Sequence, residues 1–431
     1  MRVMSSSWGT LLLGGIATLV ACATAEEPSE VKPSPDTDGG LPATVDAAPV
    51  EREAGPSPEP VEAKCSDAGW CPTALPDEDL VMKDIWPVGE RAFAIAESAT
   101  LGVKVLEWNN ADEAWRYIDD TTQNAPGFGA YAGGIWAPSE DEVYYGVAPG
   151  YVYHGKRPVP PATAWVWTRQ RLQENSGSVD PLAGYPNYWR AATRYPALGI
   201  WGTGPDNVYA WFTNTIYHLT SVDGGAPEWL PEYVATDRAN SSERLFFLSA
   251  AGTGPDDMWF SGARSRTSSG CAILVRKTAA GYRRIADGTL TSIVSPCTAR
   301  AGALLIGGAH GWLTDIQAVS EGRILGLKGA QDVVKIFLSG DDYSVAAAPV
   351  PTSVTVKAMN SLWAGPDDFW LSSRGLLVRS SGDVWNGGGY GVSTIAMNGA
   401  PFERHIHRVR GSSNTNIWAI GVRHALHKTT P

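Results

Sequence analysis

The side chains best suited to catalysis, the histidines, stand at positions that indicate architecture rather than chemistry. The chain has 7 histidines in 431 residues, and His154, His218 and His427 recur at one position of an internal repeat. Residues that recur once per repeat are spread along a repeat protein and do not form a cluster. The chain also lacks the HExxH, GxSxG, P-loop and EF-hand patterns, and no GxGxxG follows a strand. No catalytic residue is therefore assigned.

Two further patterns could bind a metal. His405 and His407 alternate, so on a strand they share one face, either as a ligand pair or, as we favour, as part of a solvated surface. Calcium needs about 6–8 converging oxygens, so aspartates in separate turns are expected to cap those turns instead. The aspartates in these turns are Asp206, Asp256, Asp257, Asp367 and Asp368. We predict no metal and no cofactor.

A stretch rich in aromatic residues, roughly 155–198, combines ring faces with planar hydrogen-bonding groups. Sugars stack their apolar faces on such rings, and peptides use the same groups, so this stretch is a candidate ligand platform. The alternative is that the insert packs over its own aromatic residues. The predicted ligand-binding residues are Trp167, Tyr185, Tyr188, Trp189, Arg190 and Tyr195.

The cysteines indicate an oxidising compartment. There are 5 cysteines, and setting Cys22 aside leaves an even number, as expected of an exported domain. Four cysteines allow three pairings, and we favour the local one, Cys65–Cys71 with Cys271–Cys297. Zinc binding is the alternative. It is disfavoured because neither pair has CxxC spacing and no histidine lies nearby in the sequence.

The N-terminus resembles a bacterial lipoprotein signal. Arg2 precedes the apolar run Leu11–Val20, which is too short to span a bilayer, and Leu19–Cys22 is similar to a lipobox. The resemblance implies a signal peptide over 1–21, cleavage before Cys22, and a membrane anchor through a lipid on Cys22. Ala23 resembles outer-membrane sorting in enteric bacteria. The alternative is an ordinary secretory signal that is cleaved near Ala21–Ala25.

Residues 22–64 are expected to form a disordered tether behind the lipid site. Residues 23–64 hold eight prolines, ten acidic and three basic residues, and no aromatic residue. Such a composition cannot bury enough apolar surface to offset the entropy of ordering. The net charge of the whole chain is −11, and no basic stripe occurs. Nucleic acid is therefore excluded as a partner, because its phosphates would be repelled.

The folded region, residues 65–431, contains an imperfect repeat led by an aromatic residue. Clear copies include Trp201–Tyr209, which reads WGTGPDNVY, and Trp363–Trp370, which reads WAGPDDFW. Seven copies begin 46 to 66 residues apart, close to the about 40–50 residues of a four-stranded propeller blade. Each copy combines turn-forming Gly, Pro and Asp residues with short strands rich in aromatic residues. No helical period of useful length appears. The fold class is therefore all-β, a single seven-bladed β-propeller.

We expect the two ends of the propeller to close the ring. The last copy, from Arg410, is too short for a full blade, and Asp79–Asp84 is a plausible strand near the other end. Pairing of N- and C-terminal strands would remove two exposed sheet edges. A pair of β-sandwiches or an open β-solenoid is the alternative fold, disfavoured because sandwiches do not repeat their sequence seven times.

The W-x-G-x-G-P-D-[DN]-[VMF]-[WY] repeat, behind a lipobox and a Pro/Glu-rich tether, resembles the propeller-repeat surface lipoproteins abundant in myxobacteria. The resemblance implies a lipid-anchored protein of the bacterial cell envelope, in the outer membrane, on either its periplasmic or its surface side. We expect a binding or scaffold module for a glycan, a peptide or a partner protein. A glycan-active hydrolase or lyase, or a purely structural envelope protein, is the alternative.

Overall fold

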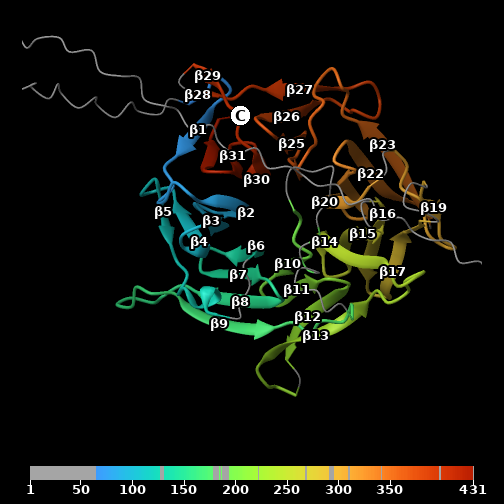
Figure 1. Cartoon of the computed structure of the whole chain (residues 1–431), viewed down its shortest axis with the longest axis horizontal. Helices are drawn as coiled ribbons and strands as arrows, with labels where there is room; N and C mark the ends of the chain where they lie inside the picture. Colours follow the sequence, from blue (N-terminus) through green and yellow to red (C-terminus); the bar gives the residue numbers. More distant parts are fainter. Residues whose placement is uncertain are drawn as a thin grey trace, which may run out of the picture. The chain divides into compact units, whose positions relative to one another are not determined.

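The computed structural model describes the propeller region and shows a ring of small β-sheets (Figure 1). Cys22 and the expected signal peptide and tether lie outside the described residues, as do Tyr185, Tyr188, Trp189 and Arg190. The described residues are 65–126, 131–177, 184, 186, 194–221, 223–266, 269–290, 296–308, 311–340, 342–397 and 399–430.

These residues form seven antiparallel four-stranded sheets, here called blades 1 to 7, which confirms the predicted fold. Blade 1 is β2 (Val81–Val88), β3 (Arg91–Ser98), β4 (Gly102–Asn109) and β5 (Ala114–Tyr117), and blade 2 is β6 (Ala132–Ser139), β7 (Glu142–Val147), β8 (Tyr151–Lys156) and β9 (Val166–Arg171). Blade 3 is β10 (Leu198–Gly204), β11 (Asn207–Phe212), β12 (Thr215–Ser221) and β13 (Pro227–Val234), and blade 4 is β14 (Glu243–Gly254), β15 (Asp257–Arg266), β16 (Ser269–Thr278) and β17 (Gly281–Ala286). Blade 5 is β20 (Leu313–Ser320), β21 (Arg323–Lys328), β22 (Asp332–Ser339) and β23 (Asp342–Pro349), and blade 6 is β24 (Ser361–Ala364), β25 (Phe369–Ser373), β26 (Leu376–Ser381) and β27 (Gly389–Ser393). Blade 7 is β30 (Ile406–Ser413), β31 (Asn416–Gly421), β32 (His424–Lys428) and, from the other end of the domain, β1 (Trp70–Thr73).

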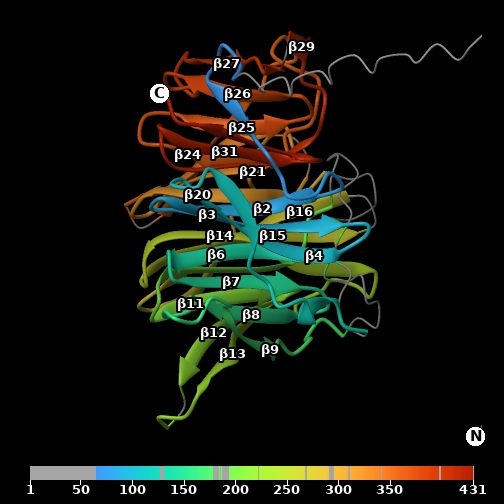
Figure 2. The ribbon, with the colours of Figure 1, turned by 90° about the vertical axis from the view of Figure 1, so that its left-hand side faces the viewer.

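The small remaining elements lie between blades. They are the 3₁₀ turn η1 (Thr122–Asn124) and the two-stranded ribbons β18 (Gly288–Thr289) with β19 (Thr298–Ala299) and β28 (Ala396–Met397) with β29 (Ala400–Pro401). Across the described residues no helix has the length and apolar character needed to cross a bilayer. Figure 2, turned by 90°, shows the β12–β13 hairpin of blade 3 extending past its neighbours.

The first strand of each blade lies innermost, and these strands meet in sequence order around the ring. β2, β6, β10, β14, β20, β24 and β30 each contact the next, and β30 contacts β2 again. The leading aromatic residue of a copy lies within this inner strand, as Trp201 does at the centre of β10. The Gly-Pro-Asp turn then reverses the chain, so that Gly204 pairs with Asn207.

The leading tryptophan of one blade packs on the repeat glycine of the next blade. Trp136 of blade 2 packs on Gly202 of blade 3, where an added Cβ would stand 2.9 Å from the ring. Trp201 packs in the same way on Gly252 of blade 4 at 3.0 Å. The W-x-G pattern therefore records packing between neighbouring blades, because only glycine leaves room for the indole ring.

The N-terminal strand closes the ring, as predicted, but it is a different strand. β1 (Trp70–Thr73) pairs antiparallel with β32, whereas Asp79–Asp84 leads into β2, the inner strand of blade 1. The prediction was wrong on the strand because residues just before a leading tryptophan belong to the inner strand of the same blade. Trp70 is fully buried in β1, and its indole N–H donates to Ser393 Oγ at 3.0 Å.

A buried ion-pair network crosses the axis of the ring. Arg408 of blade 7 donates to Asp315 of blade 5 at 2.8 Å and lies 3.4 Å from Asp84 of blade 1. Each carboxylate also accepts a backbone N–H of the following blade, Ile135 for Asp84 and Leu362 for Asp315. The neighbouring blades 7 and 1 are thus tied to blade 5 at the centre.

The predicted solvated strand face at His405 and His407 is wrong. His407 is 8% exposed, and its Nδ1 lies 2.9 Å from the backbone oxygen of Met82 in blade 1. Burial lowers its pKa to about 3. The side chain is enclosed because β30 is an inner strand, which is covered by the neighbouring blade on each face.

Candidate ligand groove between blades 2 and 3

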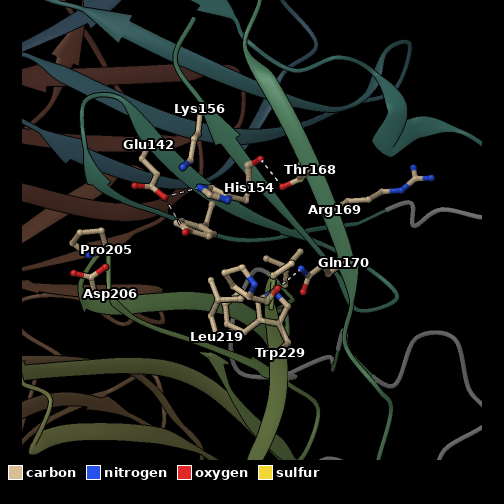
Figure 3. A pocket seen from close by; sticks show the side chains of 14 residues that line it. Glu142, His154, Lys156, Thr168, Arg169, Gln170, Pro205, Asp206, Leu219 and Trp229 are labelled. Atoms are coloured by element: carbon tan, nitrogen blue, oxygen red, sulfur yellow. Dashed lines mark hydrogen bonds and ion pairs between the residues drawn. The ribbon is translucent and has the colours of Figure 1, made fainter. Parts of the chain in front are cut away.

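An open groove of about 440 Å³ lies between the outer halves of blades 2 and 3 (Figure 3). Its size falls in the range of about 300–1,000 Å³ that is typical of small-ligand sites. Blade 2 supplies one wall, and blade 3 supplies the other together with the turn that holds Pro205 and Asp206. The lining residues are Glu142, Tyr144, Val152, His154, Lys156, Thr168, Arg169, Gln170, Pro205, Asp206, Leu219, Ala226, Pro227 and Trp229.

The period of two along β7, β8 and β9 builds the polar wall. Val152, His154 and Lys156 alternate along β8, and Thr168 and Gln170 alternate along β9, so their side chains share the face toward blade 3. Trp167 lies between Thr168 and Val166 and therefore faces the other side of the sheet. The register pairs His154 with Thr168, which keeps the polar side chains in one row.

Glu142 is the most constrained polar group of the groove. His154 Nε2 bonds to Glu142 Oε1 at 2.6 Å, and the Tyr144 hydroxyl donates to the same oxygen at 3.0 Å. The imidazole also stacks on the Tyr144 ring with centroids 4.2 Å apart. The hydrogen bond from His154 lowers the pKa of Glu142, so this carboxylate stays ionised at neutral pH.

Blades 3 and 7 carry the same stacked arrangement. The β7–β8 register pairs Tyr144 with His154, and the equivalent pairs are Tyr209 with His218 and Trp418 with His427. The rings stack at 4.3 Å in blade 3 and at 3.9 Å in blade 7. The structural role predicted for these histidines is confirmed.

In blades 4 and 6 an arginine replaces the histidine. Arg276 lies over the Trp259 ring and donates to Asp257, and Arg379 lies over Trp370. The aspartate that ends the Gly-Pro-Asp-Asp motif thus binds the third strand of its blade, a role beyond the turn capping we expected.

The apolar wall belongs to the β12–β13 hairpin. Leu219 and Trp229 are directly opposed in its register, and both are half-buried against the core between blades 2 and 3. Gln170 donates to the backbone oxygen of Pro227 at 2.8 Å and so bridges the two walls at one end of the groove. In Figure 3, Leu219 and Trp229 lie opposite Glu142, His154 and Lys156, while Arg169 points away.

A second groove of about 520 Å³ lies at the equivalent place between blades 7 and 1. His427 occupies the position of His154, and Trp108 contributes to the opposite wall. Trp108 is only 5% exposed, because its ring packs against Trp115 and Trp418 and its N–H donates to Asn110. This groove therefore offers little aromatic surface, whereas the groove between blades 2 and 3 retains the half-buried Trp229.

The structure separates the two predicted ligand residues that it describes. Trp167 packs on Tyr145 of its own blade with ring centroids 5.2 Å apart, and its N–H donates to Ile118. Tyr195 is 4% exposed, and its hydroxyl donates to the backbone oxygen of Asn360 in the connection to blade 6. Both side chains thus have packing roles. The ligand platform on the insert stays a prediction, because its other residues lie outside the described part.

Sequence reasoning missed the groove because its residues occupy positions that recur in the repeat and that predict packing. Trp229 occupies a position where an aromatic residue recurs, which predicts packing, and His154 does the same for the histidines. The available signal was positional. His154 precedes and Trp229 follows the insert at roughly 155–198, which lies in one of the two long spacings between copies.

Both predicted disulfides are present. Cys65–Cys71 and Cys271–Cys297 have S–S distances of 2.03 and 2.08 Å, which leaves no thiolates for zinc at these positions. Among the described residues, no group of three or more histidine, cysteine, aspartate or glutamate side chains could hold a metal ion.

Comparisons with known proteins show the fold alone. No family model matches the chain, and no curated protein matches it. YCF48 from Cyanidioschyzon merolae is 12% identical with a TM-score of 0.52, covering 84% of this chain and 99% of that one. YCF48 bound to D1 peptide is 11% identical with a TM-score of 0.53, covering 84% and 97%. The RRP9 WD40 repeats are 9% identical with a TM-score of 0.54, covering 86% and 100%.

Proposed function

We propose that this chain is an exported binding protein whose propeller is a rigid scaffold for one ligand groove, the groove between blades 2 and 3. The observation that carries the proposal is the pairing of a half-buried Leu219–Trp229 wall with a wall of polar side chains. Ligand sites combine such apolar surface with a few fixed polar groups. The propeller of similar fold in complex with D1 peptide supports a binding role for this architecture.

Binding fits the groove better than catalysis does. Glycoside hydrolysis with two carboxyl groups needs one of them protonated as the acid, which requires a raised pKa. Glu142 has a lowered pKa and accepts bonds from His154 and Tyr144. It is therefore an ionised acceptor held in place, suited to receiving a hydrogen bond from a ligand.

We also propose export and lipid anchoring through Cys22, in the outer membrane of a bacterial cell envelope. The lipobox-like Leu19–Cys22 and the two disulfides of the propeller support this proposal. The same features, with the tryptophan-led repeat, support kinship with the myxobacterial propeller-repeat lipoproteins. The acidic segment 23–64 would then act as the spacer between membrane and propeller.

The proposed binding site is tested with a variant whose larger side chain blocks the groove. Thr168 is exposed on the outer strand β9, so Thr168→Trp adds bulk to the groove without removing a core contact. The purified full chain and the variant are compared on a glycan array and a random-peptide array. We expect Thr168→Trp to abolish the binding seen with the parent protein.

The matched control is Val392→Trp, which places the same bulk on an exposed outer-strand residue of blade 6. It should bind as the parent does. Equal binding by Thr168→Trp and the parent, or no binding by the parent on either array, would contradict the proposal.

A further inference from the structure

We infer that the ligand of the groove between blades 2 and 3 is a saccharide that stacks on Trp229. This inference rests on the proposed function, since it names the ligand class of the same groove. A saccharide ring has an apolar face of C–H groups and a rim of hydroxyls. It therefore fits a cleft with one aromatic wall and one wall of hydrogen-bonding side chains.

The aromatic wall is held at a fixed position. Trp229 lies in the outer strand β13 directly opposite Leu219, and both pack on the core between blades 2 and 3. Their backbone is tied to blade 2 by the hydrogen bond from Gln170 to Pro227. A preformed ring of this kind binds with little loss of conformational entropy, because the side chain is already ordered.

The polar wall offers groups of the kinds that hydroxyls need. Lys156 can donate, Asp206 can accept, and the Thr168 hydroxyl, which donates to the backbone oxygen of His154 at 3.5 Å, can also accept. Glu142 is ionised and oriented by His154 and Tyr144, both bonded to its Oε1, which leaves Oε2 as a further acceptor. In Figure 3 these side chains surround one space, with Leu219 and Trp229 on its other side.

The charge and main-chain pattern favour a saccharide over a peptide. Glu142 and Asp206 face Lys156, while Arg169 points away, so the groove has no strong excess of one charge. A bound peptide strand is recognised mainly through a row of backbone donors and acceptors. The groups named above, on Glu142, Lys156, Thr168 and Asp206, are side-chain groups of the kind that hydroxyls bind. The polar groups within the groove are side chains.

The test compares Trp229→Ala with Trp229→Phe in the purified full chain. Binding is measured on a glycan array and then by titration with the oligosaccharide that gives the strongest signal. We expect Trp229→Ala to weaken binding by at least about tenfold and Trp229→Phe to retain most of it, because phenylalanine keeps a flat ring. The melting temperature of each variant shows whether the ring of blades is intact.

The control variant is Glu113→Gln, which changes the groove between blades 7 and 1. This variant should bind the oligosaccharide as the parent protein does. Peptide-array binding without glycan binding, sensitive to Thr168→Trp, would overturn the saccharide and leave the proposed function standing. Glycan binding that Trp229→Ala leaves unchanged, or that Glu113→Gln reduces equally, would overturn the stacking site. No binding to either array would overturn both proposals.

Discussion

At the scale of single residues, one register position determines much of the chemistry of the blades. An aromatic ring in the second strand is covered by a histidine or arginine in the third, as in Tyr144 with His154 and Trp259 with Arg276. An acidic or amide side chain two residues before the ring then receives a hydrogen bond, as Asp257 does. Side chains that look catalytic in the sequence are thereby committed to holding strands together.

Three buried histidines make the stability of the protein depend on pH. His407, His424 and His427 are 8%, 6% and 8% exposed. Burial lowers the pKa of His407 to about 3 and the pKa values of His424 and His427 to about 4, from 6.5. Below pH 6.5 the unfolded chain binds protons at these sites and the native protein does not. Stability is therefore complete above pH 6.5 and decreases as the pH falls, by up to about 1.4 kcal/mol per pH unit for each group.

The loss of stability is measured as the decrease in the midpoint of urea unfolding between pH 7 and pH 4.5. In this range carboxylates with lowered pKa values contribute little to the pH dependence of stability. His407→Gln keeps a polar side chain near Met82 and should remove part of the pH slope. A parent and variant with the same slope would contradict the assignment to His407.

At the scale of elements, the blade is a simple meander, and what distinguishes the blades is how their ends are joined. Blade 7 depends on β1, whose sequence neighbour in the chain is blade 1. Trp70 anchors β1 by packing edge-on against Trp370 of blade 6, with centroids 5.6 Å apart. The disulfide Cys65–Cys71 constrains the residues that lead into the same strand.

Trp70→Ala should therefore destabilise the closed ring more than the loss of most other aromatic residues. The side chain is fully buried, so its truncation should cost about 3–5 kcal/mol in the free energy of unfolding. Chemical denaturation measures this cost, and hydrogen exchange should show the fastest new opening in β1 and β32. Val392→Ala on the exposed face of β27 is the control, and equal effects of the two variants would contradict the role of β1.

At the scale of the whole molecule, the ring is closed twice, at the rim by β1 and at the axis by Arg408. The axial arginine joins carboxylates of blades 1 and 5. Such closure makes a rigid scaffold, on which a groove at the junction of two blades keeps its shape without ligand.

The proposed lipid anchor is tested in cells at this scale. Cys22→Ala removes the only thiol at the end of the lipobox-like segment, so the protein should move from the detergent phase to the aqueous phase in Triton X-114 partitioning. The propeller itself should be unaffected, as judged by intact disulfides in non-reducing electrophoresis. Unchanged partitioning of Cys22→Ala would exclude lipidation at this residue.

The sequence by itself determined the number of blades and their β character, and it favoured the pairing of the cysteines that the structure shows. It did so because repeats, turn residues such as Gly204–Asp206 and local cysteine spacing are properties of neighbouring positions in the chain. The closing strand and the groove were decided only by the tertiary structure. Lys156 and Trp229 meet across two blades, and Trp70 meets Trp370 across the ends of the domain. These contacts depend on how consecutive sheets are arranged around the axis of the ring. The spacing of residues along one strand does not encode that arrangement.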